Sequence, residues 1–472
     1  MERRNAWKTY TEEETQELEE LCADYIDFIS TCKTERLCCS RAEALAREAG
    51  YRTVQEIRAA GETLKAGSKV YAVNYGKSLI MAVLGEKPLS EGLNILGAHI
   101  DSPRIDIKQN PVYESADFAL LDTHYYGGIK QYQWVTMPLA MYGVVAKTDG
   151  TVLNVAVGDN PEDPVFCITD LLPHLDNDQM KKGTSNFIEV EDLDILVGGR
   201  PMVFGEEEAE TDEAKAAVKE PVKALLLNIL SEKYGMAEED FLSAELEIVP
   251  AGRARELGFD RSMVIGYGQD DRVCAYTSLV AQLETEEVER TALTILVDKE
   301  EIGSVGATGM TSRFFENTMA EIMDLAGQYS DLDLRRCLAN SNMLSSDVSA
   351  AFDPLYASAF EKKNAAFCGR GIVFNKFTGA RGKSGSNDAN AEYVAAVRRV
   401  MEEDEVAYQT AELGRVGLGG GGTIAYILAE YGMNVIDSGV AVLSMHAPWE
   451  VTSKADIYEA YKGYKAFLDL ME

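Results

Sequence analysis

The chain has 472 residues, 46% of them hydrophobic, and a formal net charge of −33. This length predicts about two to four domains with a sizeable core. The negative charge argues against general binding to nucleic acid or to anionic membranes, and an anionic substrate would need a local cation. No run of about 18 apolar residues is present, so we expect no membrane-spanning helix.

The eight cysteines are scattered, and none forms a Cys-x-x-Cys pair. This pattern is typical of reduced thiols in a cytosolic protein rather than of a disulfide framework. The first residues, MERRNAWKTYTEEE, lack the apolar stretch of a secretory signal. We therefore expect a cytoplasmic protein.

The N-terminal part alternates predicted helices and strands. An amphipathic helix is predicted over residues 11–30, with Thr11 and Glu14 as its capping box. A second helix is predicted over Arg41–Glu48, with Ser40 as its N-cap. Apolar segments then predict strands at Val70–Val73, Ser78–Leu84 and Leu93–His99.

Residues 110–250 differ from their flanks in that they contain short segments of alternating pattern, which predicts an inserted, mostly β domain with its own small core. The predicted elements are strands at Trp134–Tyr142, Val152–Val157 and Val165–Thr169 and a helix near Ala214–Tyr234.

After Pro250 the alternation of helices and strands resumes. A helix follows Asp270, and buried strands are predicted at Thr291–Val297 and at Gly439–Met445. Residues 1–109 and 251–472 are therefore predicted to form one α/β domain, interrupted by the insert at 110–250. Its fold is predicted as a mainly parallel central sheet flanked by helices.

Four charged residues, Asp298, Lys299, Glu300 and Glu301, directly follow the apolar segment Thr291–Val297. Adjacent acids at the end of a buried strand repel one another and lose hydration, and a divalent cation would offset that cost. The alternative interpretation is a solvated acidic loop, which is common in a chain this acidic.

Three apolar segments lead into polar clusters. LNILGAH ends at His99, TILVDKEE ends at Glu300 and Glu301, and GVAVLSM is followed by His446. The chain has only four histidines, so two of them at such places are informative. Because ligands bind where the carboxyl ends of parallel strands meet, these side chains are predicted to converge.

Asp270 and Asp347 lie at similar junctions between apolar segments. Two imidazoles and three carboxylates exceed the usual ligand set of one catalytic zinc. They suit two divalent ions that share a carboxylate, zinc first, with manganese or cobalt as alternatives. Asp101 is placed to accept the second ring N–H of His99. Of the two adjacent glutamates, one would bind metal and the other would take a proton from water.

Five segments, GAHIDSPRIDIK, GQDDR, DKEEIGS, SSDVSAAFDP and SMHAPWE, occur in the order seen in the aspartyl aminopeptidase and vacuolar aminopeptidase I family. The chain therefore resembles these dinuclear zinc metallopeptidases over essentially the whole catalytic part. The resemblance implies the dinuclear zinc peptidase fold, an inserted dimerisation domain, and a homo-oligomer that is a dodecamer built from dimers.

The resemblance also implies roles for individual residues. One ion would be held by His99, Asp270 and Asp347, and the other by Asp270, Glu301 and His446. Glu300 would be the general base, and His174 would reach the active site of a neighbouring subunit, although a lone histidine is more often structural.

The sequence departs from the family pattern at three places. Ile100 stands where Thr is common, Lys299 where His is common, and Asp271-Arg272 where Asn-Leu is usual. The adjacency of two aspartates leaves open whether Asp270 or Asp271 bridges the ions.

The expected function is a metal-dependent aminopeptidase that releases N-terminal amino acids from peptides, with acidic ones as a candidate class. Lys376 and Lys383 could meet an acidic side chain, but loop cations are usually solvated. Gly420, within Gly419–Gly422, could let the backbone approach a substrate; a phosphate cradle is weaker because no Walker lysine follows. A related deacylase or carboxypeptidase, or a protein assembly braced by metal, is the alternative.

Overall fold

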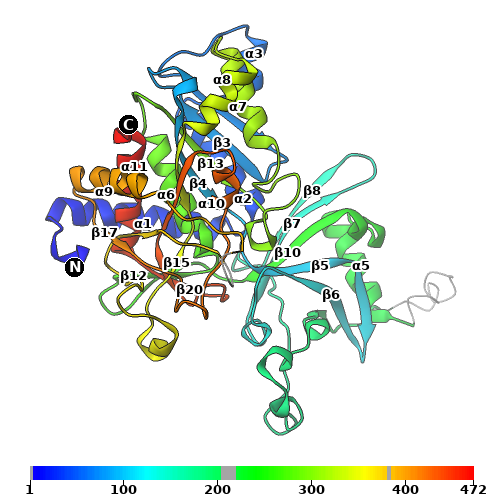
Figure 1. Cartoon of the computed structure of the whole chain (residues 1–472). Helices are drawn as coiled ribbons and strands as arrows, with labels where there is room; N and C mark the ends of the chain where they lie inside the picture. Colours follow the sequence, from blue (N-terminus) through cyan, green and yellow to red (C-terminus); the bar gives the residue numbers. More distant parts are fainter. Residues whose placement is uncertain (1–3, 204–218, 380–383) are drawn as a thin grey trace. The chain divides into compact units, whose positions relative to one another are not determined.

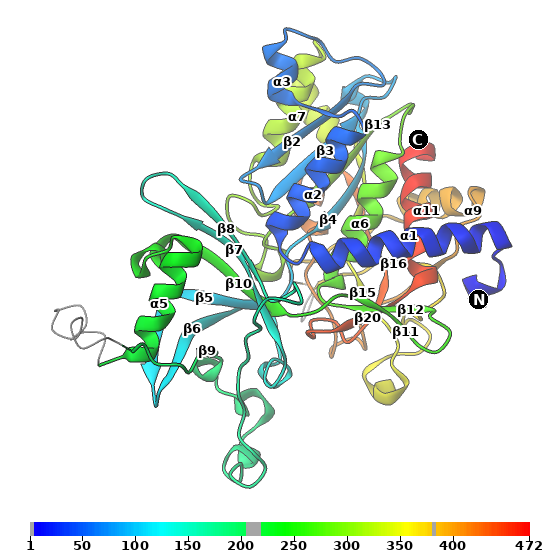
Figure 2. The same cartoon turned by 180° about the vertical axis from the view of Figure 1, so that it is seen from behind.

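The computed structural model describes residues 4–203, 219–379 and 384–472. The chain forms two compact units (Figures 1 and 2). Unit 1 comprises Met1–Ser102, Arg253–Met445 and Trp449–Glu472, and unit 2 comprises Pro103–Gly252 and His446–Pro448. Within the described ranges, every helix is too short or too polar to cross a membrane.

A mixed sheet, nine-stranded within the described residues, forms the middle of unit 1. Its central strands β13, β4, β14 and β18 are parallel neighbours, whereas β2–β3, β3–β13 and β16–β18 are antiparallel. In sheet order the strands are β1 (Arg52–Thr53), β2 (Lys69–Asn74), β3 (Ser78–Val83), β13 (Thr291–Val297), β4 (Leu93–His99), β14 (Asn342–Ser346), β18 (Asn434–Gly439), β16 (Ile372–Asn375) and β17 (Tyr408–Thr410).

Both faces of this sheet are covered, which explains why every residue of β3, β4 and β13 is buried. On β4, Leu96 and Ala98 pack into one core cluster with α1, α2, α6, α9 and α11, and Ile95 packs into another with α3, α7, α8 and α10 (Figures 1 and 2). The helices are α1 (Glu12–Thr31), α2 (Glu35–Glu48), α3 (Val54–Ala59), α6 (Gln269–Leu283), α7 (Phe314–Leu325), α8 (Asp331–Ala339), α9 (Ala391–Glu403), α10 (Ala425–Ala429) and α11 (Lys454–Leu470).

The N-terminal helices test the capping predictions. At the start of α1, the Thr11 side chain accepts from the Glu14 N–H and the Glu14 carboxylate accepts from the Thr11 N–H, so the predicted capping box is confirmed. The second prediction is wrong at its start. Helix α2 begins at Glu35, where the Thr34 hydroxyl caps the Leu37 N–H, and Ser40 lies inside the helix.

The segment before His446 also differs from its prediction. The chain leaves the central sheet at the end of β18, and β19 (Ala441–Leu443) joins a second sheet, five-stranded within the described residues. A Cβ on Gly439 would lie 2.0 Å from the carbonyl oxygen of Asp347, so the close passage at the junction requires glycine. The other strands of this sheet are β11 (Arg255–Leu257), β12 (Met263–Gly266), β20 (Glu450–Ser453) and β15 (Ser349–Ala350).

Unit 2 is built around a six-stranded antiparallel sheet, counted over its described residues. The strand predicted at Trp134–Tyr142 is confirmed only from Leu139, where β7 begins, because Trp134 ends a short 3₁₀ turn. The strand predicted at Val165–Thr169 is wrong, since this segment makes only isolated bridges. The elements are β8 (Val152–Val157), β7 (Leu139–Ala146), β10 (Ala244–Pro250), β5 (Arg104–Ser115), β6 (Phe118–Tyr126), β9 (Ile195–Gly198) and α5 (Pro221–Tyr234). Residues 214–218 of the predicted helix lie outside the described residues.

Candidate metal centre

The central strands of unit 1 place several functional side chains at one edge of the sheet. β4 ends at His99, which lies opposite Val297, the last residue of β13. Three residues after the end of β13 the chain enters a single 3₁₀ turn, η9 (Glu300–Ile302), which carries Glu300 and Glu301. β14 pairs with β4 on its other side and leads directly to Asp347. The register of three parallel strands therefore gathers these side chains.

Three groups of these side chains could each hold a metal ion. They are His99–Glu300–Asp347, His99–Asp270–Glu301 and Asp270–Asp271–Asp347, and within each group the potential ligand atoms lie within 4.8 Å of one another. His99 Nε2 lies 3.3 Å from Asp270 Oδ1 and 4.0 Å from Glu300 Oε2.

Two adjacent aspartates enter the site from the start of α6. Asp270 and Asp271 are joined by a cis peptide bond and have non-helical backbone angles, so the regular part of α6 follows them. The Ser102 hydroxyl donates to the Asp270 carbonyl oxygen at 2.6 Å, and the Asp270 N–H donates to Glu450 Oε2 at 3.0 Å. The backbone of this pair is therefore held from both sides.

Glu450 was missed by the sequence reasoning. It is 1% exposed on β20, and no short motif marks it apart from its place at the end of SMHAPWE. Apart from that motif, the signal in the sequence is a glutamate at the start of a short segment that favours a strand, since acids are rarely buried without a partner.

Asp101 connects three parts of the site. His99 Nδ1 lies 3.0 Å from the Asp101 carbonyl oxygen and 3.3 Å from its Oδ1, so the backbone rather than the side chain is the closer ring partner. The Asp101 carboxylate accepts the backbone N–H groups of Glu300 and Glu301, each at 3.2 Å. If Nδ1 donates to Asp101, Nε2 keeps the lone pair that a metal requires.

The other two charged residues of the acidic segment, Asp298 and Lys299, have a separate role. Asp298 is 1% exposed, and its Oδ2 accepts from the Thr308 hydroxyl at 2.6 Å and pairs with Lys299 Nζ at 2.9 Å. A fully solvated acidic loop is therefore a poor description of this segment.

Burial makes the charges of this cluster costly. It raises the pKa of Asp271 to about 8, with Asp270 adding to the rise and His99 opposing it. Burial and the charge of Asp270 also raise the pKa of Asp347 well above its ordinary value. For His99, burial alone lowers the pKa, but the carboxylates of Asp101 and Asp270 raise it well above its ordinary value.

Such a cluster fits divalent metal. Neither carboxylate oxygen of Asp271 makes a hydrogen bond within the described chain. Imidazole nitrogen and carboxylate oxygen are ligands that zinc accepts, and a cation would favour the charged carboxylates that burial disfavours.

The remaining predicted site residues are not members of these groups in the described part of the chain. Lys376 pairs with Asp388 and lies over the ring of Phe377, and Lys383 lies outside the described residues. Gly420 has φ +120° in an exposed stretch. His446 belongs to unit 2, where its Nδ1 lies 3.0 Å from the Gly128 carbonyl oxygen.

His174 also belongs to unit 2, where it is exposed.

An α/β sheet that gathers an imidazole and several buried carboxylates at the ends of its strands defines a metalloenzyme. A family model described as "Aminopeptidase I zinc metalloprotease (M18)" matches residues 28–468. The chain therefore belongs to the M18 family of zinc aminopeptidases, which are hydrolases that remove N-terminal residues from peptides in a metal-dependent reaction.

Relatives match over nearly the full length. The probable M18 family aminopeptidase 1 of Clostridium acetobutylicum is 60% identical over 99% of this chain and 98% of its own. The crystal structure of an M18 aminopeptidase from Thermotoga maritima has a TM-score of 0.92 at 43% identity, covering 99% of each chain. These matches confirm the α/β class. The S. cerevisiae mApe1 dodecamer structure, 21% identical with a TM-score of 0.74 over 95% of this chain and 96% of its own, shares the fold.

Proposed function

We propose that the aminopeptidase uses two divalent ions per subunit, zinc first, with manganese or cobalt as alternatives. The observation that carries this proposal is that six side chains form three overlapping groups, within each of which the potential ligand atoms lie within 4.8 Å of one another: His99, Asp270, Asp271, Glu300, Glu301 and Asp347. His99, Asp270 and Asp347 each belong to two of these groups, and the family resemblance makes Asp270 the shared ligand, with Asp271 as the alternative. His446 stays a ligand predicted from the family resemblance.

Held by these side chains, divalent ions would supply a water of lowered pKa and an electrophile for the peptide carbonyl. Glu300 is the residue that accepts the proton from the attacking water and returns it to the leaving amine. Asp101 holds the turn that carries Glu300 by accepting its N–H at 3.2 Å, so the base is oriented by a buried carboxylate. Carboxylates of the same cluster receive the free α-amine of the substrate, which would restrict cleavage to N-termini.

The preferred N-terminal side chain is a separate question. Lys376 already pairs with Asp388, so recognition of an acidic side chain would depend on Lys383 or on a rearrangement of this pair. Gly379 donates its N–H to the Gly421 carbonyl oxygen at 2.7 Å, and this bond joins the two loops from which substrate contacts are predicted.

We further propose that residues 110–250 form a dimerisation domain in a dodecamer built from dimers. The yeast mApe1 dodecamer, which shares the fold, supports this proposal. Within unit 2, Leu171, Leu172, Leu175 and Met180 are at least half exposed around His174, and such side chains are typical of an interface. The free state of all eight cysteines supports a cytoplasmic location. Native mass spectrometry of the purified protein tests the assembly.

A panel of unblocked and N-acetylated amino-acid anilides, with aspartyl, leucyl and lysyl members, tests the function. We expect hydrolysis of unblocked anilides only, lost on treatment with a chelator and restored by zinc. Cleavage of the acetylated members would indicate a deacylase, release of C-terminal residues from blocked peptides would indicate a carboxypeptidase, and no hydrolysis of any member would favour a metal-braced assembly protein.

A further inference from the structure

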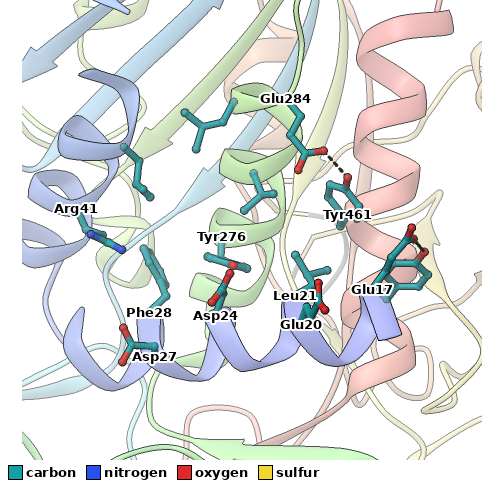
Figure 3. A pocket seen from close by; sticks show the side chains of 14 residues that line it. Glu17, Glu20, Leu21, Asp24, Asp27, Phe28, Arg41, Tyr276, Glu284 and Tyr461 are labelled. Atoms are coloured by element: carbon teal, nitrogen blue, oxygen red, sulfur yellow. Dashed lines mark hydrogen bonds between the residues drawn. The ribbon is translucent and has the colours of Figure 1, made fainter. Parts of the chain in front are cut away.

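A groove on unit 1 lies between α1, α2, α6 and α11 (Figure 3). Its volume is about 500 Å³, which is within the range of small-molecule sites. None of its lining residues belongs to the three groups that could hold a metal ion. The groove therefore requires an explanation separate from peptide hydrolysis.

One wall of the groove carries a row of carboxylates. Glu17, Glu20, Asp24 and Asp27 follow one another on α1 at intervals of three or four residues, so they share one face of the helix at a spacing of about 5 Å (Figure 3). Glu284, directly after α6, adds a fifth carboxylate on the other side of the groove.

Little positive charge balances this row. Asp27 pairs with Arg253 at 2.6 Å, and Arg41 is the single cation among the lining residues. The hydroxyl of Tyr458 donates to Glu17 at 2.7 Å, and that of Tyr461 donates to Glu284.

Glu20 accepts from the Gln16 amide at 2.8 Å. Within the described residues, neither Glu20 nor Asp24 forms an ion pair.

The floor of the groove is apolar and aromatic. Leu21 from α1 and Val280 and Leu283 from α6 line it, and the Tyr276 ring lies 5.1 Å from the Phe28 ring, centroid to centroid. Such a floor can bury methylene groups, and aromatic faces attract ammonium groups.

We propose that this groove binds a linear aliphatic polyamine. Its ammonium groups would meet Glu20, Asp24 and Glu284, and its methylene segments would lie on the apolar floor. Roughly three or four methylene groups between two extended ammonium groups span the helical repeat that separates the carboxylates. A divalent metal ion fits less well because no metal-capable group of the described residues lies in the groove. A neutral ligand would bring no positive charge to balance these carboxylates.

Calorimetric titration of the full-length protein with spermidine at low ionic strength tests the proposal. We expect one saturable site, and we expect the exchange of Glu20→Gln together with Asp24→Asn to weaken binding at least tenfold. The matched control is Glu12→Gln together with Glu13→Gln, which removes the same charge from the same helix outside the groove. The control should retain the affinity of the unaltered protein. All four residues are exposed, and unchanged thermal unfolding of both variants verifies their folding.

Three results would overturn the proposal. The first is the absence of saturable binding. The second is equal weakening by the groove variant and by the control, because that result would assign the binding to net charge alone. The third is a Mg²⁺ affinity equal to that for spermidine, because a site that requires an extended aliphatic chain must favour the polyamine by at least tenfold.

Discussion

The buried carboxylate of Asp437 predicts how the stability of unit 1 depends on pH. Asp437 lies on β18 and is 3% exposed. Burial raises its pKa from 3.8 to about 7, although the hydroxyl groups of Thr423, Thr378 and Ser345 oppose the rise. At about 1.4 kcal/mol for each pKa unit, this difference makes the ionised group cost roughly 4 kcal/mol in the folded state above pH 7.

The sign follows from proton binding. Between pH 3.8 and about 7 the folded chain holds a proton on Asp437 that the unfolded chain has lost, so the contribution of this group to stability falls as the pH rises. Asp437→Asn keeps the shape and removes the titration. The free energy of unfolding of the variant minus that of the unaltered protein should therefore increase by about 1.4 kcal/mol per pH unit up to about pH 7 and then stay constant.

Urea unfolding at a series of pH values from about 5 to 8, followed by tryptophan fluorescence, measures this difference. Asp24→Asn, which makes the same exchange at an exposed aspartate of the same unit, is the matched control. A difference for Asp437→Asn that stays constant within about 0.5 kcal/mol across this range would refute the reasoning, because burial would then not govern the titration of this carboxylate.

Three further predictions concern the site and the core. Glu300→Gln should retain bound metal, measured by elemental analysis, and should lower kcat by at least about 10²-fold, because the amide cannot take a proton; nearly full activity would contradict the role of Glu300. Asp101→Asn should weaken metal affinity by about 10- to 100-fold in a chelator competition assay, since the acceptor for two N–H groups and for His99 is altered; an unchanged affinity would remove Asp101 from the site. Leu344→Ala, at a fully buried position of β14, should lower the free energy of unfolding by about 2–5 kcal/mol, and Leu344→Met should cost less than about 1.5 kcal/mol; equal losses would indicate that no cavity forms.

The predictions that agree with the structure to the residue are those that depend on local sequence patterns. Strands β4 and β13 have the predicted bounds, Leu93–His99 and Thr291–Val297, because each is a mostly apolar segment that leads abruptly into charged or polar residues. The Thr11 capping box of α1 is confirmed for a similar reason, since both of its hydrogen bonds form within one helical turn.

Predictions failed where two local signals competed or where a partner was distant. Helix α2 uses Thr34 rather than Ser40 as its cap, although Ser40 has the suitable acid three residues later. The segment Gly439–Met445 looks like one strand, yet Gly439 ends β18 in the central sheet, whereas Ala441–Leu443 form β19 in the second sheet, where β19 pairs with β15 and β20.

Apolar periodicity and short motifs are local properties, and they were sufficient to predict the α/β class, the family, and the charged and imidazole side chains at the ends of β4 and β13. The folded chain was needed to find that the Asp101 carboxylate accepts the N–H groups of Glu300 and Glu301, and that Glu450 accepts the N–H of Asp270. These partners are about 180 to 200 residues apart in the chain. Contacts at that separation depend on how the sheets pack, and no local pattern encodes them.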